Sequence, residues 1–66
     1  MNVTINGTNR QVAPARNLSD LVNAFCPQPR HVMVELNGVI VPSHQWPQTS
    51  LKDGDTLELV AFVGGG

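Results

Sequence analysis

The sequence predicts an α+β fold in which a mixed sheet of four to five strands carries one short helix across one face. Period-2 alternation of apolar residues indicates several short strands, and Asn-Gly or Asp-Gly dipeptides indicate the turns between them. Only one segment has helical spacing. The chain has 66 residues, of which 41% are hydrophobic, so it holds enough apolar material for one small core.

Two hairpins are expected. Val3 and Ile5 alternate with polar residues, Asn6-Gly7 favours the positive φ values of a tight turn, and residues 9–12 can return as the antiparallel strand. The second hairpin repeats this pattern. Its alternating residues are 32–36, its turn is Asn37-Gly38, and its return strand is 39–41, which ends before Pro42.

Residues 18–25 have the spacing of an amphipathic helix. Asn17 is the expected N-cap, and Pro27 prevents the helix from continuing. The residues expected on its buried face are Leu18, Leu21, Val22 and Phe25.

Asp53-Gly54 is a third turn of the kind that joins hairpin strands, and it precedes a last strand over residues 56–63. This strand is expected between the two hairpins and parallel to the first strand, because it has no sequence neighbour left to pair with. That arrangement is a β-grasp fold, with one α+β domain at residues 1–63 and a flexible glycine tail at 64–66.

The composition excludes several classes of partner. The formal net charge is −1, and the four basic residues are scattered, so nucleic acid and anionic membranes are not expected to bind. Cys26 is the only cysteine, which excludes an internal disulfide and a zinc site with several cysteines. A small domain with no disulfide, no signal peptide and no membrane span is expected in the reducing cytoplasm.

The three glycines Gly64-Gly65-Gly66 predict that the C-terminal carboxylate is the reactive group. A tail without Cβ atoms can enter a channel about as narrow as a backbone. Its carboxylate needs adenylation by ATP before a sulfur nucleophile can attack it. A partner must supply the nucleotide site, because the chain lacks a Gly-rich phosphate loop. A cloning scar or a truncated linker is the alternative origin of the three glycines.

Five stretches follow one another in an order and spacing typical of one family. The chain resembles the thiamine-biosynthesis sulfur carriers (the ThiS family), which are ubiquitin-like β-grasp proteins that end in Gly-Gly. The match covers essentially the whole chain. The stretches are Met1–Gly7, Leu18–Leu21, Val34–Pro42 with Trp46 beyond it, Leu51–Asp55 and Leu57–Gly66.

The resemblance implies that the chain is a protein cosubstrate and not an enzyme. An E1-like adenylyltransferase would activate Gly66, the second member of the Gly65-Gly66 pair, and Gly64 is an additional glycine. Sulfur from a cysteine desulfurase relay would give a thiocarboxylate, which thiazole synthase would consume. A molybdopterin-type sulfur carrier, a ubiquitin-like modifier and a bare interaction module remain as alternatives.

The last strand has two faces with different expected roles. Leu57, Leu59 and Ala61 are expected to face the core, while Val60 and Phe62 point the other way. Val60 and Phe62 are interpreted as an apolar docking patch for the activating enzyme. A twisted sheet that half-buries both side chains is the alternative.

The remaining reactive or aromatic side chains are expected to have structural roles. Trp46 is expected as a lid on the open end of the core rather than a binding residue, and Cys26 as an inert thiol rather than a redox group. No bound cofactor, metal site or acid–base pair is expected. His31 and His44 are expected at the surface or in loops, and Asp53 and Asp55 are expected to serve the turn around Gly54.

Overall fold

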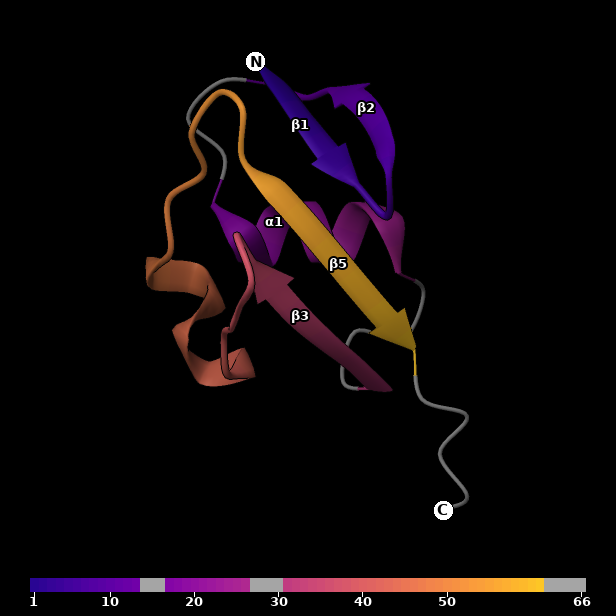
Figure 1. The fold of residues 1–66 in the computed structure, drawn as a ribbon. Coiled ribbons are helices and arrows are strands. Elements are labelled where there is room, and N and C mark those ends of the chain that lie inside the picture. Colours follow the sequence, from indigo (N-terminus) through magenta and orange to yellow (C-terminus); the bar gives the residue numbers. More distant parts are fainter. Residues whose placement is uncertain (14–16, 27–30, 62–66) are drawn as a thin grey trace.

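The computed structural model describes residues 1–13, 17–26 and 31–61, and it contains a single mixed sheet backed by one α-helix (Figure 1). The strand order is β2-β1-β5-β3-β4, which is the expected β-grasp topology. The strands are β1 (Asn2–Ile5), β2 (Thr8–Gln11), β3 (Val32–Leu36), β4 (Val39–Ile40) and β5 (Thr56–Ala61).

The last strand of the sequence occupies the centre of the sheet. β5 runs parallel to β1, with Ile5 opposite Leu57, and antiparallel to β3, with Val32 opposite Ala61. Figure 1 shows β5 between these two strands with α1 behind the sheet. Among the described residues β5 ends at Ala61, so the expected extension to residue 63 lies outside the described part of the chain.

The two Asn-Gly dipeptides form the predicted hairpin turns. Asn6 and Gly7 have φ values of 50° and 82°, and Asn37 and Gly38 have 52° and 85°. Asp53-Gly54 forms the predicted turn that introduces the last strand. Only its glycine has a positive φ, and it precedes β5 without closing a hairpin, because no strand comes directly before it.

The helix α1 (Leu18–Phe25) begins and ends close to where the sequence predicts. The backbone N–H of Asp20 donates to Asn17 Oδ1 at 2.8 Å, which confirms the N-cap. The prediction that Phe25 lies on the buried face of α1 was wrong. Its side chain is 39% exposed because it occupies the last helical residue, and the Arg10 guanidinium carbon lies 5.2 Å from its ring centroid.

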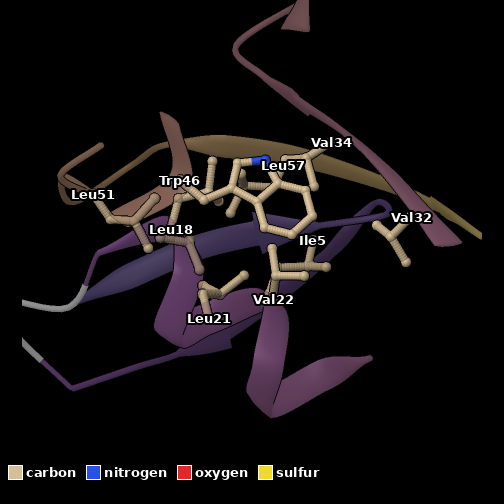
Figure 2. Close-up of a cluster of buried hydrophobic side chains, with 10 residues drawn as sticks. Ile5, Leu18, Leu21, Val22, Val32, Val34, Trp46, Leu51 and Leu57 are labelled. Carbon is tan, nitrogen blue, oxygen red and sulfur yellow. The ribbon is translucent and has the colours of Figure 1, made fainter. Parts of the chain in front are cut away.

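The 3₁₀ helix η2 (Ser43–Gln48) follows β4 and places Trp46 in the core. The indole is 6% exposed, and its Nε1–H donates to the Val41 carbonyl at 2.9 Å. Figure 2 shows it among side chains from α1 and the sheet. The structural role predicted for Trp46 is therefore confirmed. The core comprises Val3, Ile5, Leu18, Leu21, Val22, Val32, Val34, Trp46, Leu51 and Leu57.

No described helix is long and apolar enough to cross a membrane.

We expect Trp46→Phe to lower the free energy of unfolding by about 2–3 kcal/mol, because the smaller ring leaves a void and the Val41 carbonyl loses its donor. Urea denaturation followed by far-UV circular dichroism measures this, since the variant has no tryptophan left for fluorescence. His44→Ala, on the exposed side of the same 3₁₀ helix, is the control and should leave the midpoint unchanged. An unchanged midpoint in Trp46→Phe would contradict a core role.

Candidate functional site

The candidate site begins where β5 leaves the sheet towards the C-terminal glycines. Paired backbone contacts with β1 reach only as far as Leu57, whereas those with β3 continue to Ala61. The distal half of β5 therefore has a backbone strand on one side only among the described residues. Phe62, Gly64, Gly65 and Gly66, the other predicted site residues, lie outside the described part of the chain.

Asn6 holds the unsupported edge of β5. Its backbone N–H donates to the Leu57 carbonyl at 2.9 Å. Its side-chain Oδ1 then accepts the Leu59 N–H at 2.8 Å, and its Nδ2 donates to the Leu59 carbonyl at 3.2 Å. The amide side chain thus takes the place that another β1 residue would occupy, and it extends the hydrogen-bonded edge of β5 by one residue pair.

Asn37 does the same at the other end of β5. Its backbone N–H donates to the Thr56 carbonyl at 2.8 Å, and its Oδ1 accepts the Thr56 N–H at 2.9 Å. Its Nδ2 donates to Asp55 Oδ1 at 3.0 Å. The two hairpin turns therefore hold β5 at Thr56 and at Leu59, a role that their local sequence does not reveal.

The two aspartates near β5 serve the loop that introduces it. Asp55 is 9% exposed, and its Oδ2 accepts the Lys52 N–H at 2.8 Å. Asp53 Oδ1 accepts the Asn2 N–H at 2.6 Å, which ties the loop to β1. Asp55 thus performs the predicted turn chemistry, whereas the bond from Asn2 to Asp53 joins β1 and is not a bond within the turn. Within the described residues no group of histidine, cysteine or acidic side chains is placed to hold a metal ion.

The two faces of β5 differ in the way the alternation predicts, with one exception. Leu57 is fully buried, Leu59 is half-buried, and Val60 on the opposite face is 43% exposed beside Met33. Ala61 lies on the same face as Leu57 and Leu59, as predicted, but its side chain is exposed. The docking role of Val60 stays a prediction.

An open groove of about 590 Å³ lies where α1 ends, on the helix side of the sheet. Leu59 and Ala61 contribute its β5 wall, and Phe25 and Cys26 contribute its helix wall. Asn6 also lines it, so the groove and the β5 clamp share a residue. Sequence spacing could not reveal this groove, because it depends on how far the helix extends over the sheet.

Cys26 has the properties of an unreactive thiol. It lies at the C-cap of α1 with its side chain partly buried, and its backbone N–H donates to the Val22 carbonyl. Burial raises the pKa of the Cys26 thiol, because desolvation disfavours the thiolate. The thiolate is the nucleophilic form, so the raised pKa suits a structural role.

Replacing Asn6 tests the clamp on β5. Asn6→Gly removes both side-chain bonds to Leu59 but tolerates the positive φ, so we expect it to cost about 1 kcal/mol of stability. Asn6→Ala should cost about 1 kcal/mol more, because a Cβ is unfavourable at this φ. Amide hydrogen exchange at Leu59 should accelerate in both variants. Exchange at Val34 should change only as far as the global stability of the domain changes. Unchanged protection at Leu59 would contradict the clamp.

The alkylation rate of Cys26 should rise with pH. The midpoint of this rise should lie above the ordinary thiol pKa of 9.0 in the folded protein, and near 9.0 in urea. The raised pKa also means that this group stabilises the fold fully below the pKa of the unfolded state. That contribution is lost as pH rises through the folded pKa. Iodoacetamide trapping with mass spectrometry measures both midpoints. A folded midpoint at or below 9.0 would contradict the effect of burial.

Known proteins resemble this chain over its full length. A crystal structure of a thiamine biosynthesis protein (ThiS) from Geobacter metallireducens superimposes with a TM-score of 0.86 at 39% identity, covering 100% of both chains. The solution structure of a thiamine biosynthesis protein from the same organism gives 0.82 at 38% identity, covering 100% of this chain and 88% of that one.

Two sequence relatives differ in their length. A thiazole synthase of Paramagnetospirillum magneticum is 39% identical over 66 residues, which are 100% of this chain but only 20% of that protein. The uncharacterised protein ycf40 of Pyropia yezoensis is 33% identical over 66 residues, covering 100% of this chain and 93% of that protein. The ThiS family model matches residues 3–66. With its β-grasp topology and a match that reaches the last glycine, the chain belongs to the ThiS family.

Proposed function

We propose that this protein is a sulfur carrier of thiamine biosynthesis, which carries sulfur as a thiocarboxylate on Gly66. The observation that carries the proposal is the ThiS family match, which runs from residue 3 through the glycine tail to the final residue. The likeness to ThiS structures at TM-scores of 0.86 and 0.82 supports it. In this role the chain is a protein cosubstrate, and its partners perform the catalysis.

The chemistry begins with an unreactive carboxylate. An E1-like adenylyltransferase joins the Gly66 carboxylate to the α-phosphate of ATP and releases pyrophosphate, which creates a mixed anhydride. A sulfur nucleophile charged by a cysteine desulfurase relay then attacks the carbonyl carbon and expels AMP. The donor is a persulfide, so this attack gives an acyl disulfide. A thiol then attacks the donor sulfur of its S–S bond, which releases the thiocarboxylate and leaves a disulfide between the thiol and the donor. ATP belongs to the activating partner, so the chain itself needs no bound cofactor or metal.

We propose a division of roles between the domain and its tail. Residues 1–63 form the domain that the partners recognise, and residues 64–66 form the tail that enters their active sites. Three extended residues span roughly 10 Å. The clamps of Asn6 and Asn37 on β5 support this assignment, because they fix the strand from which the tail continues. Val60 and Phe62 are the proposed docking residues beside it.

Thiazole synthase is the proposed acceptor of the sulfur. The support is the Paramagnetospirillum magneticum thiazole synthase, a protein in which one fifth of the length is similar to this entire chain. Two proteins that must meet are often joined in one chain, since the join raises their effective concentration. The cytoplasm, a reducing compartment, is the proposed location.

The free C-terminal carboxylate is tested by changing only the tail. Deletion of Gly65 and Gly66, or addition of one alanine after Gly66, should abolish pyrophosphate exchange by the E1-like enzyme encoded in the same genome. Circular dichroism should show both variants folded, because the changed positions follow Ala61, the last residue of β5 in the described part of the chain. Exchange that survives the added alanine would overturn the proposal.

Intact mass from cells separates the carrier from its alternatives. A mass increase equal to the difference between sulfur and oxygen supports the thiocarboxylate, whereas conjugates of higher mass would indicate a protein modifier. Restored growth of a thiamine auxotroph, but not of a strain lacking molybdopterin synthesis, identifies the thiamine branch.

A further inference from the structure

The two hairpin turns carry the same dipeptide in nearly the same conformation. The sequence holds Asn-Gly at these two places only, and each dipeptide follows an aliphatic residue. The φ values are 50° and 82° at Asn6 and Gly7, and 52° and 85° at Asn37 and Gly38. All four residues are exposed. A difference in reactivity between the two dipeptides in the folded protein must therefore come from their tertiary contacts.

Asn-Gly is a dipeptide that loses the side-chain amide spontaneously in water. The backbone nitrogen of the glycine gives its proton to the solvent and attacks Cγ of the asparagine, and no Cβ on the glycine shields that nitrogen. The new N–C bond closes a succinimide ring, the bond from Cγ to Nδ2 breaks, and ammonia leaves with a proton returned by the solvent. Water then opens the ring to aspartate or isoaspartate. The sum exchanges one amide for a carboxylic acid, with water as the co-reactant.

The Asn6 amide has neutral partners at the end of a strand contact. Its Oδ1 accepts the Leu59 N–H at 2.8 Å, and its Nδ2 donates to the Leu59 carbonyl at 3.2 Å. Leu59 lies beyond Leu57, where the pairing with β1 ends, so the amide can be released without opening the paired strands. Asn6 also lines the groove at the end of α1 together with Arg10, and no acidic residue of the described chain lines it. The contacts of Asn6 therefore oppose ring closure only weakly.

The Asn37 amide instead has a buried carboxylate as a partner. Its Oδ1 accepts the Thr56 N–H at 2.9 Å, and its Nδ2 donates to Asp55 Oδ1 at 3.0 Å. Asp55 is 9% exposed, and its Oδ2 accepts the Lys52 N–H, which fixes the carboxylate in place. A hydrogen bond to an ionised acceptor is about twice as strong as a neutral one. The negative charge also disfavours the anionic intermediate of ring closure.

We propose that Asn6 is a site of spontaneous deamidation in the folded protein, and that Asn37, its local equivalent, is protected by its bond to Asp55. This reaction is independent of the function proposed above, because it needs only the chain itself and water.

Deamidation of Asn6 removes the clamp on β5. Both products lack Nδ2, so the Leu59 carbonyl loses its donor and faces a carboxylate oxygen. In isoaspartate the main chain also gains a methylene group, which lengthens the turn. The chain gains one negative charge in either case. The reaction therefore releases the distal half of β5 from the side of β1.

Peptide mapping measures both sites in the same molecule. The protein is held at mildly alkaline pH, either folded or in urea, then cut with trypsin and analysed by mass spectrometry. Cleavage after arginine and lysine places the two sites in separate peptides, 1–10 and 31–52. In the folded protein we expect Asn6 to convert about tenfold faster than Asn37. In urea the two rates should be equal, because the tertiary contacts are lost.

Asp55→Asn tests the protecting carboxylate, because it removes the charge and keeps an oxygen that can accept a hydrogen bond. It should raise the rate at Asn37. Asp20→Asn, at an exposed position of α1, is the matched control with the same change in net charge, and it should alter neither rate. The free energy of unfolding of each variant, measured in urea, gives the share of conversion that passes through the unfolded chain, and that share is subtracted.

The converted protein is separated from the starting protein by anion exchange, through its additional negative charge. Amide hydrogen exchange at Leu59 should be faster in the converted form. Exchange at Thr56, which Asn37 holds, should stay the same. Equal exchange at Leu59 in the two forms would contradict the loss of the clamp.

Three results would overturn the proposal. Equal rates in the folded protein, or a faster rate at Asn37, would show that Asp55 does not protect its neighbour. A difference that persists in urea would place the cause in the local sequence. An Asn6 that stays unconverted in the folded protein, over a time in which the unfolded chain converts, would show that the fold protects both sites.

Discussion

β5 joins two hairpins that have no other strand contact with each other. In the order β2-β1-β5-β3-β4, each hairpin pairs with β5 on its own side, so the sheet exists only when the last strand of the sequence lies between them. Leu57, in the middle of this contact, is fully buried and belongs to the core together with Val3 and Val34. Burial of this one strand therefore unites the hydrophobic core, the sheet and the base of the tail.

The local features of the fold were predictable from the sequence because they depend on nearby residues. Asn-Gly dipeptides require little beyond their own φ preferences, and Asn17 caps α1 through a residue three positions away. How far the helix covers the sheet was not predictable. Phe25 and Ala61 carry the correct periodicity, but both side chains are exposed in the assembled fold.

The candidate site likewise combines local features that the sequence predicts with long-range contacts that it does not. The glycine tail and the outward direction of Val60 follow from sequence, because composition and alternation are local. The bonds from Asn6 to Leu59 join residues that are 53 positions apart, and the bond from Asn37 to Asp55 joins residues that are 18 positions apart. Neither could be derived before the register was known. The side chains that support β5 are thus a property of the assembled sheet.

The central position of β5 has a mechanical consequence. A partner that draws the C-terminus into a narrow channel pulls β5 along its own axis. The hydrogen bonds of β5 to β3, and those to β1 and Asn6, run across that axis, so the load falls on many of them together in shear. An edge strand pulled sideways would instead lose its bonds one after another, as a zipper opens. The domain can therefore bear tension at its C-terminus while its core stays closed.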